Sequence, residues 1–461
     1  MHNVATSGKA GLSLIGALAL GAASCGGGDG DGQSRDAAAD VGRIADGMNQ
    51  PADGATPGLL TRRDFNNDGF DDIVVGAPGL LGGEVLVYFG GGAFDTTPDG
   101  TLDASGISLG VADFNDDGFG DVIAGSPADG VGGVDAGRVD VFFGGAGATL
   151  DAESDWTARG ASGDRLGTSV AGAGDVNGDG FGDIVVGAPG DQDTMNGRAL
   201  VFFGAADPDT GADGSLLGDA AGDAFGASVA WASDVNRDTF DDVIVGAPEA
   251  GGTPTTGDGA ATLFLGGAGA TFDEIADGTF SGVAEEFGTA VLGLGDANGD
   301  GHGDFAVGAP RALGGVGRVY VFLGGNAIDS ASDAQIEGDG TSAAFFGTTL
   351  GAGDFNGDGL GDLSAGFQFL GRVEVYLGTR MALDEIRDHA MDITATSGVA
   401  GTVGDLNNDG FDEVAVGGPS ASEVRIFLGG NPVDETTSDG TLTGAPAEQF
   451  GAALASALPP R

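Results

Sequence analysis

Three observations predict an all-β fold built of seven like units. A nine-residue acidic turn recurs seven times, a short run rich in β-branched residues follows each copy, and a second apolar run closed by glycine follows that. Repeated β-rich units of this kind stack into one body. Four short antiparallel strands per unit, set radially as blades, cover one another's faces and leave few exposed edges. The sequence therefore predicts a seven-bladed β-propeller of four-stranded antiparallel blades.

The recurring turn has the composition of a calcium-binding loop. In the clearest copy, DVNGDGFGD from Asp175 to Asp183, oxygen side chains occupy positions one, three, five and nine. A glycine at position six permits a sharp turn, and position seven offers its backbone carbonyl. Three carboxylates crowded into one turn repel one another unless a cation lies between them. A single copy would be typical of an ordinary Asn/Asp/Gly turn, but seven copies favour about seven calcium ions.

The expected ligands fall at the same five positions of every copy. The first positions are Asp64, Asp113, Asp175, Asp234, Asp296, Asp354 and Asp405. The third positions are Asn66, Asn115, Asn177, Asn236, Asn298, Asn356 and Asn407. The fifth positions are Asp68, Asp117, Asp179, Asp238, Asp300, Asp358 and Asp409.

Positions seven and nine complete each set. The seventh positions, expected to bind through the carbonyl, are Phe70, Phe119, Phe181, Phe240, His302, Leu360 and Phe411. The ninth positions are Asp72, Asp121, Asp183, Asp242, Asp304, Asp362 and Glu413. An EF-hand would need a bidentate Glu at position twelve and flanking helices, whereas position twelve is Val or Ala in every copy here. The loops therefore open into strands.

Three copies depart from the pattern. Thr239 replaces the glycine of loop four, which should strain the bend and weaken that site. Glu413 closes loop seven with one more methylene than Asp, which a small shift could accommodate. His302 occupies a carbonyl-donating position, so we expect its imidazole to face solvent.

The strands around each loop carry their own signals. A turn resembling Gly-Ala-Pro ends the first strand of each unit except the sixth, where Gly366-Phe367-Gln368 stands instead. The second apolar runs begin at Glu84, Arg138, Arg198, Ala260, Arg318, Arg372 and Glu423. Weaker strands are expected near Leu102, Trp156, Leu216, Phe280, Ile336 and Leu442. Signals of the Phe-Gly type follow at Leu166, Phe225, Phe287, Phe346 and Phe450.

Two segments could close the ring. The stretch from Gln449 to Leu458 reads as one more Phe-Gly strand with no loop after it, and it could complete the first blade. The stretch from Leu59 to Arg63 could fill the same place instead. Both cannot occupy it, and the sequence leaves the choice open.

The combination of Phe-Gly, calcium loop and Gly-Ala-Pro, at this spacing, resembles the FG-GAP repeats of the integrin α-subunit propeller and its bacterial relatives. The resemblance covers roughly Leu59 to Leu458. It implies a propeller whose calcium ions rigidify the loops on one face, while loops on the opposite face are free to contact partners. Those loops include Ala128 to Gly137, Gly190 to Gly197 and Glu249 to Gly259.

The net charge and the amino-terminal sequence limit which partners and which cellular location we expect. With 70 acidic and 17 basic residues the net charge is -53, so nucleic acid and anionic membrane surfaces are poor partners. Residues 1–24 resemble a secretory signal, and Cys25 follows Ala-Ala-Ser as in a bacterial lipobox. We expect Cys25 to be lipidated, residues 25–57 to form a flexible tether and residues 58–461 to form the propeller. The alternative is a generic signal peptide with an incidental cysteine, and a secreted protein.

Function is less constrained than fold. No set of Ser, His and Asp with plausible support and no phosphate-binding GxxxxGK[ST] motif is present, so we expect a non-enzyme. The favoured interpretation is an exported, monomeric adhesion or protein-recognition module on a bacterial outer membrane or cell surface. Carbohydrate binding, with Trp156 or Trp231 as a stacking platform, is the alternative, and a carboxylate-based glycan-active enzyme is a weaker one. A purely structural role, as a calcium-stabilised surface scaffold, also stays open.

Overall fold

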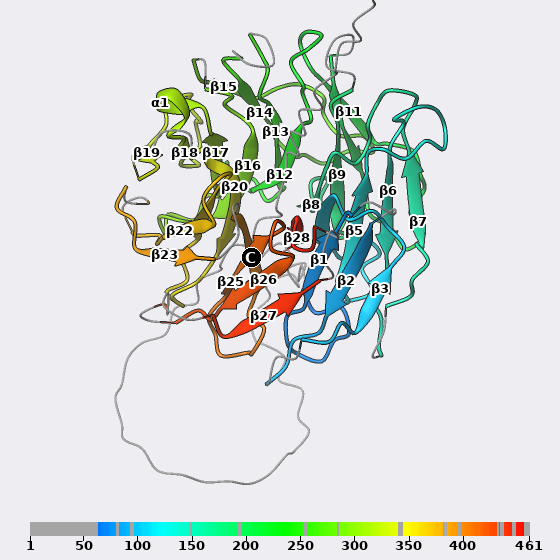
Figure 1. Cartoon of the computed structure of the whole chain (residues 1–461). Helices are drawn as coiled ribbons and strands as arrows, with labels where there is room; N and C mark the ends of the chain where they lie inside the picture. The colour runs from blue at the N-terminus through cyan, green and yellow to red at the C-terminus, as the bar shows by residue number, and fades with distance from the viewer. Residues whose placement is uncertain are drawn as a thin grey trace, which may run out of the picture.

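Seven four-stranded antiparallel sheets stand around a common axis as the blades of a propeller (Figure 1). The computed structural model describes residues 63–455, except 80–82, 93–95, 148–149, 191–195, 252–256, 284, 340–343, 381–382, 384, 394–397, 431–432, 434–437 and 445–448. The proposed signal, Cys25 and the tether lie outside the described residues. The predicted fold class and blade count are confirmed.

The two inner strands of each blade are buried along their described length. The innermost strands are β4 (Ser108–Ala112), β8 (Ser169–Gly174), β12 (Ser228–Ser233), β16 (Ala290–Gly295), β20 (Phe346–Gly353), β24 (Val399–Gly404) and β28 (Ala453–Ala455). The second strands are β1 (Ile73–Ala77), β5 (Asp121–Ser126), β9 (Asp183–Ala188), β13 (Asp242–Ala247), β17 (Asp304–Ala309), β21 (Asp362–Phe367) and β25 (Glu413–Gly418). Burial on both faces explains why these runs contain hardly any polar residue away from their ends.

The two outer strands of each blade are less completely buried: most alternate between buried and more exposed residues, whereas the third strands β6, β10 and β22 have four buried residues in a row. The third strands are β2 (Glu84–Tyr88), β6 (Arg138–Phe142), β10 (Arg198–Phe202), β14 (Ala260–Phe264), β18 (Arg318–Phe322), β22 (Arg372–Tyr376) and β26 (Glu423–Phe427). The fourth strands are β3 (Gly100–Leu102), β7 (Trp156–Arg159), β11 (Gly214–Leu217), β15 (Gly278–Ser281), β19 (Ala334–Glu337), β23 (His389–Asp392) and β27 (Gly440–Thr443). The single helical turn α1 (Ala312–Gly315) joins β17 to β18.

The C-terminal strand closes the ring. Strand β28 pairs with β1, with Leu454 opposite Val75, so the first blade has the strand order β28-β1-β2-β3. Figure 1 shows β28 beside β1 near the axis, between the first and last blades. Of the two segments that could fill this place, the one beginning at Gln449 does so.

The core lies between neighbouring blades. Phe280 of β15 packs against Phe305 and Phe322 of the next blade, with ring centroids 5.2 and 4.6 Å away. Trp156 of β7 meets Phe202 of the next blade at 5.2 Å in the same way. Such edge-to-face pairs hold adjacent sheets together beyond the area that they bury.

Close packing explains the repeated glycines. A Cβ on Gly187, which ends β9, would lie 2.0 Å from the carbonyl oxygen of Gly226 in the next blade. Gly226 in turn donates its N–H to Gly246 of its own blade at 3.0 Å. The glycine of each Phe-Gly signal thus bonds one blade and touches another, so any side chain on Gly187 would force the blades apart.

Candidate metal centre

The seven acidic turns all lie at one end of the ring, since six of them join the innermost strand of a blade to the second strand and the first turn leads directly into β1, the second strand of its blade. Loop three shows how the backbone wraps around its oxygens. Asp175 accepts the N–H of Asp179 on Oδ1 at 3.0 Å and that of Gly180 on Oδ2 at 3.1 Å. Asp179 accepts the N–H of Phe181 at 3.0 Å. Asn177 Oδ1 also accepts the N–H of Asp179, at 2.8 Å, so the side chains of positions one, three and five all bond within the turn.

The ninth residue of each loop is a buried carboxylate that holds the blade together. Asp183 accepts the N–H of Val176 at 2.9 Å and that of Gly204, beyond the third strand, at 2.8 Å. The first six loops share this pattern. Because charged carboxylates are costly to bury, the side chain needs these donors, a proton or a cation.

Burial raises the pKa of these ninth-position carboxylates far above the usual range. The pKa rises to about 8 for Asp72, Asp121, Asp242 and Asp304 and to about 9 for Glu413. Desolvation is the main cause; the backbone donors oppose it, and the other carboxylates of each loop add to it. The pKa values of Asp183 and Asp362 are also raised, for the same reasons. Without a cation, these buried carboxyls therefore keep their protons to a higher pH than an exposed aspartate does.

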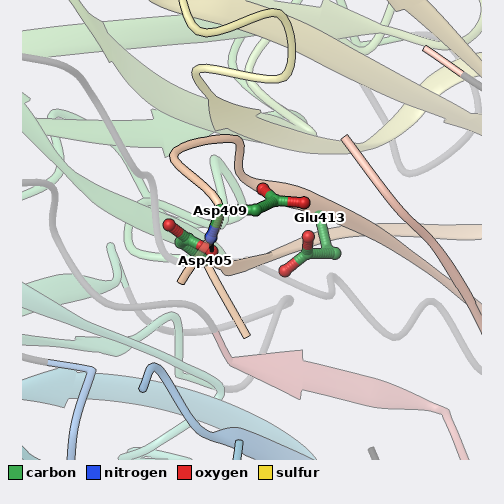
Figure 2. A group of neighbouring side chains, drawn as sticks. All are labelled: Asp405, Asp409 and Glu413. Atoms are coloured by element: carbon green, nitrogen blue, oxygen red, sulfur yellow. Dashed lines mark hydrogen bonds between the residues drawn. The ribbon is translucent and has the colours of Figure 1, made fainter. Parts of the chain in front are cut away.

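Loop seven brings its carboxylates closest together. Asp405, Asp409 and Glu413 each offer an oxygen, and these oxygens lie within 4.8 Å of one another (Figure 2). No other group of three such side chains comes this close among the residues that the structure describes. The longer Glu413 side chain bonds Leu406 N at 2.5 Å and also reaches the Asn407 amide at 3.3 Å. The extra methylene thus carries the carboxylate toward the loop rather than away from it. A set of oxygen donors alone fits a hard cation such as calcium.

Loop four keeps the shape of the others despite Thr239. Thr239 has φ +83°, a left-handed value that β-branched residues rarely adopt. Its N–H still donates to Asp234 Oδ2 at 2.8 Å, as the glycine does elsewhere. The predicted strain is therefore present in a turn that retains its hydrogen bonds.

The expectation for His302 was wrong. Its side chain is only 14% exposed, and its Nδ1 lies 3.1 Å from Asp300 Oδ1. Next to His302, Arg237 of loop four in the neighbouring blade reaches over loop five and donates to the Asp300 carbonyl at 3.4 Å. Residues of one loop therefore cover the next.

Backbone hydrogen bonds link the seven loops into a closed belt. The N–H of position eight in each loop donates to the carbonyl of position one in the preceding loop. The pairs are Gly120 to Asp64, Gly182 to Asp113, Asp241 to Asp175, Gly303 to Asp234, Gly361 to Asp296, Asp412 to Asp354 and Asp71 to Asp405. Buried Arg63 strengthens the last junction through Asp71 at 3.7 Å and Asp412 at 3.4 Å. Order in one loop is thus coupled to packing between blades.

A second repeated aspartate was missed at the sequence level. It directly precedes the fourth strand, and its carboxylate accepts an N–H from the turn after the third strand at 2.8 to 3.2 Å. Its copies are Asp99, Asp155, Asp213, Asp277, Asp333, Asp388 and Asp439. The connections before it vary in length, which hides the repeat. A fixed place one to two residues before the weak fourth strand is the signal that could have found it.

Other predicted residues are placed as follows. Trp156 and Trp231 are both buried, so neither presents a face on which a sugar could stack. The segments 128–137, 190–197 and 249–259 join second to third strands and so lie at the end opposite the acidic turns, although 191–195 and 252–256 are outside the described residues. No helix in the described part of the chain is long and apolar enough to cross a membrane.

Comparisons with known proteins agree with this architecture. FG-GAP repeat matches cover residues 58–88, 105–142, 166–202, 225–264, 287–322 and 397–440, which leaves out the sixth blade. Chicken integrin alpha-6 is 33% identical over 152 residues, which are 32% of this chain and 14% of that protein. Bovine phosphatidylinositol-glycan-specific phospholipase D is 33% identical over 189 residues, 38% of this chain and 22% of that protein. The chain therefore spans less than a quarter of the length of these relatives.

A solved structure of BBS1N in complex with ARL6DN, soaked with lead, has 9% identity and a TM-score of 0.43, and covers 73% of this chain and 80% of that one. The repeats and the sheet topology define the class of protein as a seven-bladed repeat propeller. The chain belongs to the FG-GAP repeat proteins, with a propeller like that of the integrin α-subunits.

Proposed function

We propose that the protein is an exported, calcium-stabilised propeller that recognises another protein, as an adhesion or recognition module at the cell surface. The observation that carries this proposal is the contrast between the two ends of the ring. One end repeats the same acidic turn seven times, whereas the other end carries connections that differ in length and composition from blade to blade. A rigid scaffold with one variable face is an arrangement that binding proteins use.

Calcium is the cation that this proposal assigns to the turns. Each turn would offer the carboxylates of positions one, five and nine, the amide oxygen of position three and the carbonyl of position seven. Loop seven supports the assignment best, because its three carboxylate oxygens already lie together. The ions would supply the positive charge that the buried ninth carboxylates lack, and would hold the belt of loops in register.

Binding is proposed in preference to catalysis. The similarity to integrin α-subunits supports it, and the buried tryptophans give no support to a sugar platform. The similarity to a phospholipase D covers only 22% of that enzyme, so we do not carry its activity over to this chain.

A selection experiment tests the recognition function. The calcium-loaded full chain would be immobilised and exposed to a displayed library of random twelve-residue peptides and, separately, to a glycan array. We expect enrichment of peptides that is lost on chelation, and no comparable glycan binding. Glycan binding with no peptide enrichment would overturn protein recognition in favour of the carbohydrate alternative.

Export through a lipid anchor at Cys25 is the remaining part of the proposal. It is supported by the signal-like residues 1–24 and the lipobox-like Ala-Ala-Ser before Cys25. Mass spectrometry of the protein from membranes should find diacylglyceryl-modified Cys25 as the first residue. An unmodified Cys25 within a secreted chain would remove the anchor and leave secretion.

A further inference from the structure

The sixth blade departs from the repeat at the end of the ring opposite the acidic turns. It lacks Gly-Ala-Pro, it is the blade that the FG-GAP repeat matches leave out, and it doubles the phenylalanine of the Phe-Gly signal. Of the extra aromatics, Phe346 and Phe367 are fully buried and pack together at 4.9 Å. Phe345 and Phe369 are their outward-facing neighbours in the chain.

Phe345, which is half-buried, and Phe369 lie beside the turn of the fifth blade, and the Arg311 guanidinium lies 5.5 Å from the centroid of the Phe345 ring. The rings of Phe345 and Phe369 meet edge to face at 5.4 Å, and Phe369 is 57% exposed. The Phe345 N–H bonds the Gly315 carbonyl at 3.0 Å, which fixes the α1 turn beside it. Leu313 in that turn is 50% exposed. We call Leu313, Phe345 and Phe369 the blade 5–6 patch.

Two of the three patch residues occupy backbone conformations that disfavour large apolar side chains. Leu313 has φ +55° and Phe345 has φ +53°. At the position of Phe345 the other repeats have Arg165, Ala224, Glu286 and Gln449 with the same left-handed φ. The fold therefore needs the left-handed backbone but does not need an aromatic residue there. Asn or Gly would suit these two left-handed backbone positions better. Large apolar side chains at such positions therefore mark a contact surface.

The charges around the patch select the partner. Arg311, which lies over the Phe345 ring, pairs with Glu286. On the same two blades Arg318 pairs with Glu337, Arg372 pairs with Asp339 and Asp392, and Glu285 accepts the Tyr320 hydroxyl. Asp392 and Glu337 are the most open, at 64% and 54% side-chain exposure, whereas the three guanidinium side chains are 15 to 39% exposed. A partner therefore meets negative charge around an apolar centre.

We propose that the blade 5–6 patch binds a cationic protein segment that inserts an aromatic or large aliphatic side chain flanked by Lys or Arg. A second copy of this chain is disfavoured, because two bodies of net charge -53 repel each other. This proposal rests on the protein-recognition function above, and it specifies the binding surface and the chemical class of the partner.

The peptide selection tests the patch when it is repeated with variants. Leu313→Asn and Phe345→Asn suit the left-handed backbone, and Phe369→Ser changes an exposed side chain, so the triple variant should fold. The matched control is Ile386→Ser, which removes an exposed side chain, 72% exposed, from a connection at the acidic-turn end. Circular dichroism and the melting temperature would verify folding of both.

We expect enriched peptides to combine Phe, Trp, Leu or Ile with Lys or Arg. Synthetic copies should bind the triple variant at least tenfold more weakly and the Ile386→Ser control equally well. Enriched peptides that are acidic, or whose affinity is unchanged in the triple variant, would overturn the patch while leaving protein recognition intact. Absence of any enriched peptide would overturn both. Dimerisation in sedimentation velocity that the triple variant abolishes would replace the cationic partner with a second copy.

Discussion

The two ends of the propeller differ in how strictly their connections repeat. At one end, seven turns share the same backbone hydrogen bonds, even where Thr239 or Glu413 replaces the usual residue. At the other end, the short loop that carries Phe369 in the sixth blade stands where the fifth has the α1 turn. The uniform end serves the fold, because every turn has the same structural task. The variable end is the one to which we assign partner binding.

The largest expected effect concerns charge at the uniform end. The ninth-position carboxylates have folded pKa values near 8 against 3.8 in the unfolded chain, so the metal-free fold holds protons that the unfolded chain has lost. The stability of the chelated protein should therefore fall as pH rises from about 4 to 8.

If calcium replaces those protons, as we propose, the calcium-loaded protein should not lose this stability. The gap in unfolding free energy between the two forms should widen by several kcal/mol across the window, since one pKa unit corresponds to about 1.4 kcal/mol. Denaturant unfolding at pH 4.5, 6 and 8 with calcium or chelator measures it. A gap that stays constant would contradict the shared carboxylate site.

A matched pair of variants compares the two ends directly. Asp304→Ala orphans the N–H groups of Ala297 and Gly324, which it accepts at 2.9 and 2.8 Å, and should cost about 2 to 4 kcal/mol. Asp392→Ala removes an exposed partner of Arg372 and should cost about 1 kcal/mol or less. Denaturant midpoints at constant calcium give both values. Equal losses would show that the two ends contribute alike.

The smallest effect sharpens the comparison within the uniform end. Thr239→Gly removes the strain of a left-handed threonine. It should raise the calcium affinity of loop four, and it should raise the free energy of unfolding by about 1 kcal/mol or less. The reverse change, Gly180→Thr in loop three at φ +99°, should lower both. Titration with terbium, followed by its luminescence, can resolve the weak site. Unchanged affinity in both variants would mean that the strain at Thr239 does not reach the ion.

Much of this architecture follows from the sequence because its signals repeat. In every unit an acidic turn and an apolar run, such as those that begin at Glu84 and Arg138, mark two strands. Seven such units bury their sheet edges when they close into a ring. The fourth strand of the sixth blade, β23, was not foreseen. Its sequence, HAMD, has no alternation and a single buried apolar residue, so pairing with β22 alone defines it.

Other features depend on contacts between blades, which a single repeat cannot reveal. The hydrogen bond from Arg237 to the Asp300 carbonyl joins loop four to loop five, and the closure by β28 depends on pairing across the whole chain. The Phe345 and Phe369 pair could be read only as an odd doubling of aromatics until the fold placed both outside the core. The local sequence pattern predicts the strands of a blade, whereas contacts with neighbouring blades determine which residues are exposed.

The most direct test of the central claim is to count calcium ions on the full chain by equilibrium dialysis and to measure its melting temperature with calcium and with chelator. The account predicts about seven ions per chain and a fall in melting temperature of many degrees on chelation, since each site at a hundredfold excess of calcium over its Kd contributes about 2.7 kcal/mol. One ion or none, with an unchanged melting temperature, would contradict it.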